Sequence, residues 1–85
     1  MNWTVAVDPA ARKQLKRIPK ADAERIRAVA REFVVNPYAG DIRKMEGEED
    51  VWRRRVGAYR ILYEVRAKAG LIYVLDVRRR TSNTY

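Results

Sequence analysis

The stretch VWRRRVGAYRILYEV, residues 51–65, constrains the fold more than any other part of the chain. Two runs rich in β-branched, aromatic and arginine residues flank Gly57-Ala58, and a two-residue connection with glycine first is typical of a type II′ hairpin turn. Such a short loop fixes the register of the two strands that it joins. The predicted cross-strand pairs are Val56–Tyr59, Arg55–Arg60, Arg54–Ile61, Arg53–Leu62 and Trp52–Tyr63.

Side chains alternate between the two faces of a strand, so this register divides the hairpin residues into two sets. The set expected to pack on the rest of the protein is Trp52, Val56, Tyr59, Ile61 and Tyr63. The opposite face carries Arg53, Arg55 and Arg60. Like charges directly opposite one another destabilise a sheet by roughly 0.2–1 kcal/mol, so stability alone would not pair Arg55 with Arg60. Guanidinium groups are rigid, bidentate donors, which favours a phosphate-binding face over a merely solvated basic surface.

Arg54 falls on the apolar face of the predicted hairpin. We expect its guanidinium to reach an edge of the sheet or to pair with an acid, such as Asp76. A bulge that turns the side chain outward is the alternative. The sequence assigns Arg54 no functional role.

The N-terminal part of the chain predicts a strand and two helices. WTVAVD, residues 3–8, alternates apolar and polar side chains as a half-buried strand does. Asp8-Pro9 then begins a helix, with an N-cap residue and a proline at the first helical position. Pro19 should end that helix, because the residue before a proline is kept out of helical geometry. A second helix is expected over residues 20–35, where one apolar stripe comprises Ile26, Val29, Ala30, Phe33 and Val34.

The remainder of the chain predicts strands. Asn36-Pro37 should stop the second helix, and residues 38–50 form a connector with a short edge strand near DIRKM and an acidic loop. Three strands follow, over residues 51–56, 59–66 and 71–78. The predicted fold class is α+β: an N-terminal strand, a helical hairpin, and then antiparallel strands that form one twisted sheet. One domain is expected over residues 1–85.

The charge of this chain fits two interpretations equally, a polyanionic partner, most simply nucleic acid, or a merely basic and soluble surface. The formal net charge is +8, and residues 51–85 alone carry nine Lys/Arg against two Asp/Glu. The chain has no Cys and no His, which predicts no disulfide and no zinc site. We expect no metal and no cofactor. Neither a signal-peptide pattern nor an apolar run of membrane-spanning length occurs, so we expect a cytoplasmic protein with no membrane partner.

Motifs spread along the chain resemble the RelE/ParE superfamily of toxins from type II toxin–antitoxin systems. They are Asn36-Pro37, Lys44-Met45-Glu46-Gly47, the run WRRRVGAYRILYEV from Trp52 to Val65, and Val77-Arg78-Arg79-Arg80 before Tyr85. The resemblance covers essentially the whole chain. It implies a helical hairpin packed on a twisted antiparallel sheet, and a cognate antitoxin that holds the toxin inactive.

The RelE branch of this superfamily cleaves mRNA on the ribosome, with the RNA 2′-OH attacking the adjacent phosphate. That reaction needs a base for the hydroxyl, cations for the developing charge and an acid for the leaving oxygen. By position, the resemblance implies catalytic roles for Arg60, for Arg80 as the acid and for Tyr85 as the base. The residues that it implies for binding RNA phosphates are Arg53, Arg55 and Arg79.

Two departures from the family pattern keep other functions open. Arg79 stands where many members have histidine, and Tyr85 is the last residue of the sequence. The spacing from arginine to tyrosine varies in the family, so Arg79 and Arg80 can exchange roles. The ParE branch poisons DNA gyrase instead, and a decayed basic module would bind only its antitoxin or RNA. We favour the metal-independent RelE-type mRNA endoribonuclease, because the arginine cluster of the hairpin is complete.

Overall fold

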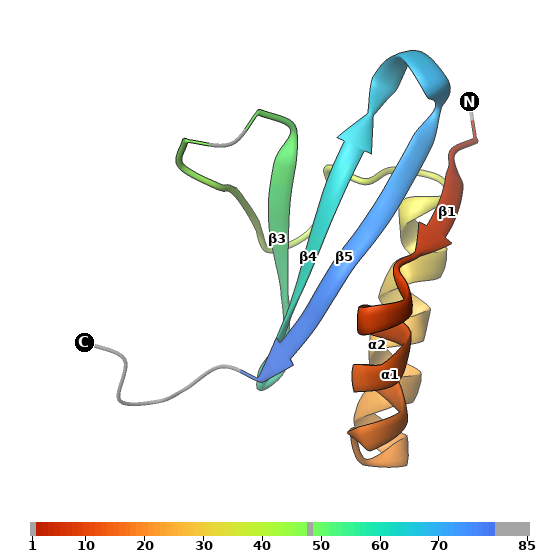
Figure 1. The fold of residues 1–85 in the computed structure, drawn as a ribbon, viewed down its shortest axis with the longest axis vertical. Helices are drawn as coiled ribbons and strands as arrows, with labels where there is room; N and C mark the ends of the chain where they lie inside the picture. Colours follow the sequence, from red (N-terminus) through yellow and green to blue (C-terminus); the bar gives the residue numbers. More distant parts are fainter. Residues whose placement is uncertain (1, 48, 80–85) are drawn as a thin grey trace.

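Five strands of the computed structural model, which describes residues 2–47 and 49–79, form one mixed sheet in the order β1-β5-β4-β3-β2. Their bounds are β1 Thr4–Val7, β2 Ile42–Lys44, β3 Val51–Val56, β4 Tyr59–Arg66 and β5 Leu71–Arg79. β1 runs parallel to β5, and every other neighbouring pair is antiparallel. Figure 1 shows β3, β4 and β5 side by side, with β1 next to β5. The predicted α+β architecture is confirmed.

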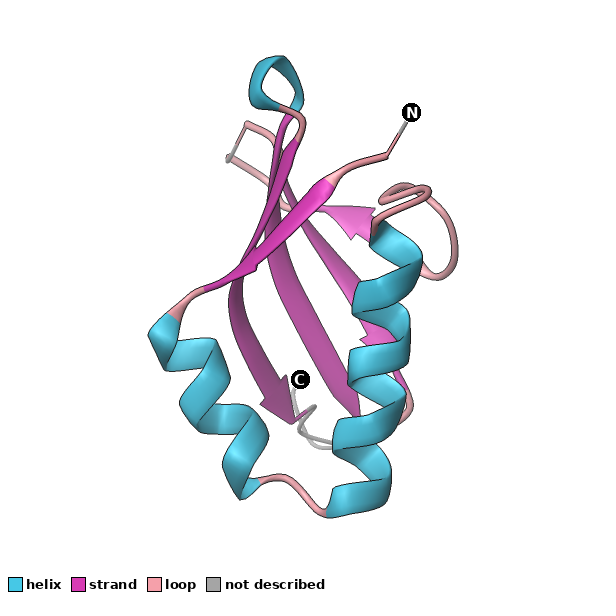
Figure 2. Ribbon diagram, turned by 90° about the vertical axis from the view of Figure 1, so that its right-hand side faces the viewer, coloured by secondary structure: helices cyan, strands magenta, loops and turns pink. Residues whose placement is uncertain are grey.

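Two helices, α1 (Pro9–Arg17) and α2 (Lys20–Phe33), cover one face of this sheet (Figure 2). Asp8 caps α1 as predicted, because its Oδ1 accepts a hydrogen bond from the Ala10 N–H at 2.9 Å. Ile18, which precedes Pro19, is extended with ψ 141°, and this ends α1. α2 ends earlier than predicted, at Phe33. Its last turn tightens there, since the N–H groups of residues 34 and 35 each donate to the carbonyl oxygen three residues back.

The β3–β4 hairpin has the register that its turn predicts. All five predicted pairs are present, from Val56 opposite Tyr59 to Trp52 opposite Tyr63. Gly57 has a φ of +57°, whereas Asp50 is the one non-glycine residue with positive φ among those described, so Ala58 has negative φ. Positive φ at the first loop position alone is what a type II′ turn requires.

The hydrophobic core lies between the helices and the sheet. The helices contribute four buried side chains, and β4 and β5 contribute seven: Ala11, Ile26, Val29 and Phe33, then Tyr59, Ile61, Tyr63, Val65, Ile72, Val74 and Val77. Trp52 and Val56 pack against this cluster from β3, on the face that the sequence predicts. The hairpin therefore presents its arginine-bearing face away from the helices.

A β-bulge in β5 decides which of its charged side chains turn outward. Tyr63 pairs with Val74, but the neighbouring Leu62 pairs with Asp76, so Leu75 is the extra residue. One extra residue reverses the alternation beyond it. As a result Asp76 and Arg78 lie on the outer face, while Val77 stays in the core at 2% exposure. Without the bulge, alternation from Val74 would turn Arg79 outward instead of Arg78.

Candidate functional site

The outer face of the sheet carries a row of arginines across three neighbouring strands. Arg55 of β3 is opposite Arg60 of β4, and Arg60 is opposite Arg78 of β5. In the next row along the strands, Arg43 of β2 is opposite Arg53 of β3. Side chains directly opposite have Cβ atoms about 4.5–5.5 Å apart, and rows on one face are about 7 Å apart. We call these five residues, Arg43, Arg53, Arg55, Arg60 and Arg78, the arginine face.

The structure brings together three of the residues predicted to bind phosphate or act in catalysis, namely Arg53, Arg55 and Arg60. Arg79 is exposed but pairs with Tyr59, which puts it in register with the helix-facing side chains and away from the arginine face. Arg80 and Tyr85 lie outside the described residues.

Sequence reasoning missed Arg43 and Arg78. Placing Arg43 requires the register of β2 against β3, and the connection over residues 45–50 does not fix that register as a two-residue turn does. Placing Arg78 requires the bulge at Leu75, and the nearly continuous apolar run LIYVL gives no alternation from which a bulge could be located. The sequence offered one signal for the bulge, Asp76, the single acid of this strand. Burying its charge in the core would be costly, so Asp76 should lie on the outer face.

The arginine face is largely uncompensated in charge. Arg78 Nε donates to Asp76 Oδ2 at 2.6 Å, and Asp76 Oδ1 also accepts from the Val77 N–H. No carboxylate of the described residues forms an ion pair with the other four arginines of this face. Arg60 Nε is buried, and no described residue accepts a hydrogen bond from it. Stability does not favour such an arrangement, whereas unpaired guanidinium donors are suited to binding phosphate groups.

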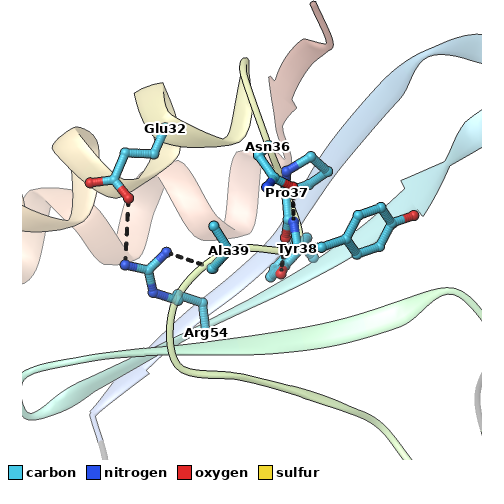
Figure 3. Close-up of polar contacts among 7 residues, drawn as sticks. Glu32, Asn36, Pro37, Tyr38, Ala39 and Arg54 are labelled. Atoms are coloured by element: carbon cyan, nitrogen blue, oxygen red, sulfur yellow. Dashed lines mark hydrogen bonds and ion pairs between the residues drawn. The ribbon is translucent and has the colours of Figure 1, made fainter. Parts of the chain in front are cut away.

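Arg54 lies behind this face, among the helix-facing side chains (Figure 3). Its Nη2 is 3.5 Å from Glu32 Oε1 of α2, and its Nη1 donates to the Ala39 carbonyl oxygen at 3.2 Å. The expectation of an acidic partner is therefore confirmed, but the suggested partner, Asp76, is wrong. Asp76 is on the opposite face of the sheet because of the β5 bulge. The register of β3 is continuous at Arg54, so no bulge turns it outward.

The loop that Arg54 contacts leads directly into the arginine face. The Tyr63 hydroxyl donates to the Pro37 carbonyl oxygen at 2.6 Å, and the Tyr38 N–H donates to Asn36 Oδ1 at 3.0 Å. Further along, the Arg55 N–H donates to the Asp41 carbonyl oxygen at 2.9 Å. These contacts fix the loop over the sheet and so place β2, with Arg43, beside β3.

The donor set of this site suits phosphate groups and not a metal ion. Across residues 2–47 and 49–79, no cluster of three or more Asp, Glu, His or Cys side chains could hold a cation. In the same part of the chain, no helix is long and apolar enough to cross a membrane.

Comparisons with known proteins agree with this fold. A family model described as the ParE toxin of the type II toxin–antitoxin system parDE matches residues 5–84. A Methanocaldococcus jannaschii protein named RelE1 is 25% identical over 83 residues, covering 94% of this chain and 92% of that protein. The RelE of the RelE–RelB complex from Pyrococcus horikoshii OT3 is 29% identical, with a TM-score of 0.84 over 96% of this chain and 99% of that chain. The isolated E. coli RelE toxin shares the fold at 18% identity, with a TM-score of 0.83 over 96% of this chain and 88% of that chain.

These likenesses define the class of protein as a small protein with the RelE-like α+β fold. Because the matched family model spans nearly the whole sequence, the chain belongs to the ParE toxin family of type II toxin–antitoxin systems, within the RelE/ParE superfamily. The resemblance seen in the sequence motifs is thereby confirmed.

Proposed function

We propose that this toxin is an mRNA endoribonuclease of the RelE type, acting on ribosome-bound messages. The observation that supports this most directly is the row formed by Arg55, Arg60 and Arg78, in which three cations are held on rigid strands. The RelE names of the relatives that are 29% and 25% identical also support it.

In the proposed reaction the arginine face binds the RNA phosphates and stabilises the charge that develops at the scissile one. The 2′ oxygen forms a bond to the adjacent phosphorus while the bond to the 5′ oxygen breaks, which leaves a cyclic phosphate and a free 5′ hydroxyl. Arg60, at the centre of the row, is assigned to the scissile phosphate, and Arg53 and Arg55 to binding. The family resemblance assigns Tyr85 as the base that takes the 2′ proton and Arg80 as the acid. Arg79 is kept as a candidate for binding RNA outside the row.

A cognate antitoxin is the proposed protein partner. The RelE proteins of Pyrococcus horikoshii and Methanococcus jannaschii were both solved in complexes with RelB. Such a partner would inactivate this toxin if an acidic or amphipathic segment covered the arginine face or displaced Tyr85.

Induced expression of the chain without a partner should arrest translation and create new mRNA ends, which sequencing of RNA termini would map. Arg60→Ala and Tyr85→Phe should each lower cleavage by about 10²-fold or more, since they remove a charge-stabilising group and a base. Arg66→Ala is the matched control, because it removes one arginine from the far end of β4, where it pairs with Glu64. Co-expression of the antitoxin should abolish the new ends. Undiminished cleavage by Arg60→Ala would contradict the proposed role of the arginine face.

Inhibition of DNA gyrase is the second candidate function. It is favoured by the ParE description of the matched family model and by the position of Arg79 opposite Tyr59, away from the arginine face. In that case the purified toxin would block supercoiling while mRNA stayed intact. A chain that is harmless without its partner would instead indicate a non-catalytic binding module.

A further inference from the structure

Asp76 is an acid at the border of the arginine face. It lies on the outer side of β5, two residues before Arg78, and the bulge at Leu75 turns both side chains to that side. A carboxylate repels phosphate groups and lowers the net charge of a surface that would bind them. Its presence beside this face therefore calls for a reason other than the attraction of phosphate.

The carboxylate of Asp76 is held in one orientation. Its Oδ1 accepts a hydrogen bond from the Val77 N–H at 2.8 Å, and its Oδ2 accepts one from Arg78 Nε at 2.6 Å. The side chain of Asp76 is 21% exposed, whereas that of Arg78 is 71% exposed. A short acid that is anchored to the backbone therefore provides a fixed contact for a long and exposed arginine.

This contact determines where the guanidinium of Arg78 lies. Residues i and i+2 share one face of a strand and are roughly 7 Å apart, so a side chain that bonds two residues back leans along the strand. Arg78 thus lies over the sheet instead of extending past the end of β5, and Arg60 is directly opposite it on β4. Among the described residues, Asp76 alone accepts a hydrogen bond from the side chain of Arg78. Without that contact an exposed arginine samples many rotamers.

The contact also leaves the most useful donors of Arg78 free. Asp76 takes the Nε–H, and both Nη atoms of the planar guanidinium keep their N–H groups. A pair of such donors binds phosphate in a bidentate manner. Because residues directly opposite have Cβ atoms about 4.5–5.5 Å apart, Arg60 and Arg78 are close enough to share one phosphate group.

Strand β4 carries a similar ion pair at its far end. Glu64 and Arg66 are also two residues apart on the outer face, and Arg66 Nε donates to Glu64 Oε1 at 2.7 Å. Arg66 is opposite Leu71, away from the row that contains Arg78. Removal of Glu64 therefore takes the same charge from the same face without releasing an arginine of the row, which makes it a matched control.

We propose that Asp76 is a positioning residue, which holds the Arg78 guanidinium beside Arg60 so that both arginines bind one phosphate group. That this phosphate is the scissile one rests on the proposed function, whereas the contact itself rests on the arginine face. The expected effect is opposite to that of charge alone. Removing a negative charge from an anion site should strengthen anion binding, but loss of Asp76 should weaken it, because Arg78 is released.

A titration of the free chain with inorganic phosphate, followed through the arginine Nε–H signals in NMR spectra, tests this inference without requiring cleavage. The signal of Arg78 is identified by its loss in Arg78→Lys. In the parent chain it should lie apart from the signals of exposed arginines and shift as phosphate binds. In Asp76→Ala it should join those signals, and phosphate should bind at least about threefold more weakly. Glu64→Ala should bind phosphate as tightly as the parent or more tightly.

The rate of cleavage of ribosome-bound mRNA gives a second readout. Asp76→Ala should lower kcat by about tenfold or more and change KM by less, since the group is misplaced while most binding contacts remain. In an Arg78→Ala background the same substitution should have no further effect, because Asp76 acts through Arg78. Thermal melting checks that the variants fold. Arg78→Lys, which keeps the charge without the planar fork, should weaken phosphate binding at least as much as Asp76→Ala.

Three results would overturn the inference. Tighter phosphate binding by Asp76→Ala, equal to that of Glu64→Ala, would mean that Asp76 only lowers the charge of the face. An unchanged Arg78 Nε–H signal in Asp76→Ala would mean that other contacts hold the guanidinium. An equal loss of rate in the parent and Arg78→Ala backgrounds would mean that Asp76 does not act through Arg78. A parent chain that binds phosphate as predicted but cleaves no mRNA would support the positioning role and contradict the proposed function.

Discussion

The three consecutive arginines of β3 have different structural roles, and Arg54 differs from its two neighbours. Arg53 and Arg55 point to the outer face, whereas Arg54 points toward the helices with its side chain 14% exposed. Its guanidinium contacts Glu32 of α2 and the carbonyl oxygen of Ala39, and it lies against Gly40. Arg54 is thus a structural link that supports the arginine face from behind.

Gly40→Ala should test this link. Gly40 has a φ of +87°, and an added Cβ would lie 2.4 Å from Arg54 Cζ, so the guanidinium would have to leave its two partners. Gly47→Ala is the control, because Gly47 has a φ of +77° but nothing within 4 Å of an added Cβ. The left-handed backbone should cost about 1–2 kcal/mol in both variants, and lost Arg54 contacts should cost Gly40→Ala about 1–3 kcal/mol more.

Urea denaturation would measure these free energies of unfolding. In an Arg54→Ala background the difference between the two glycine variants should shrink, because the contacts at stake are already gone. Equal costs for Gly40→Ala and Gly47→Ala in the parent chain would show that Arg54 moves aside freely.

At the scale of the elements, Asp8 joins the start of α1 to the sheet. Its Oδ1 accepts from the Ala10 N–H at 2.9 Å, and its Oδ2 accepts from the Tyr73 hydroxyl of β5 at 2.6 Å. The hydrogen bond from Tyr73, and then that from Ala10, lower the pKa of Asp8 below its ordinary value of 3.8. One carboxylate therefore serves both as a helix cap and as a cross-element contact.

The pH dependence of stability should report this carboxylate. Because its pKa is lowered on folding, Asp8 stabilises the protein fully above about pH 4, and the contribution is lost as pH falls below 3.8 through the lowered pKa. Asp8→Asn keeps a capping side chain but removes the charge, so it should flatten the acid limb of unfolding curves recorded between neutral and acidic pH. Asp22→Asn, at an exposed ion pair, is the control and should leave that limb unchanged. An acid limb identical in Asp8→Asn and the parent would contradict this account.

At the scale of the whole molecule, Tyr63 connects the sheet, the helix layer and the loop before β2. Its ring packs on Phe33 with the centroids 4.4 Å apart, and its hydroxyl donates to the Pro37 carbonyl oxygen at 2.6 Å. Burial raises the pKa of Tyr63 from 10.0 to about 12, despite an opposing effect of the Arg54 charge.

Alkaline unfolding should follow the ionisation of Tyr63. A pKa raised on folding gives stability that is intact below pH 10 and is lost as pH rises from about 10 to about 12. A titration of phenolate absorbance should show this tyrosine ionising together with unfolding. Tyr63→Phe should remove that step and, by leaving the Pro37 carbonyl without its donor, lower the free energy of unfolding by about 1–3 kcal/mol. The exposed Tyr38→Phe is the control, and an unaltered alkaline transition in Tyr63→Phe would exclude this role.

Much of the fold and part of the candidate site follow from the sequence, because they depend on contacts between residues close in the chain. The Gly57-Ala58 turn dictates the hairpin register, and with it the shared face of Arg53, Arg55 and Arg60. Asp8-Pro9 and Pro19 set the limits of α1 through local capping and backbone geometry. The excess of positive charge on α1 is also visible in the sequence. Whether its cations form ion pairs with the described carboxylates is visible only in the structure.

Only the tertiary structure decided the features that require distant segments to meet. The bulge at Leu75 allows β5 to keep its pairing with β4 while Val77 stays buried in the core. It also brings Arg78 rather than Arg79 to the arginine face. The packing of α2 over the sheet gives Arg54 its partner, Glu32. The register of β2 against β3, which the connection over residues 45–50 leaves open, adds Arg43. Local geometry thus placed the arginines of the hairpin, while long-range pairing determined the arginines and the acids that surround them.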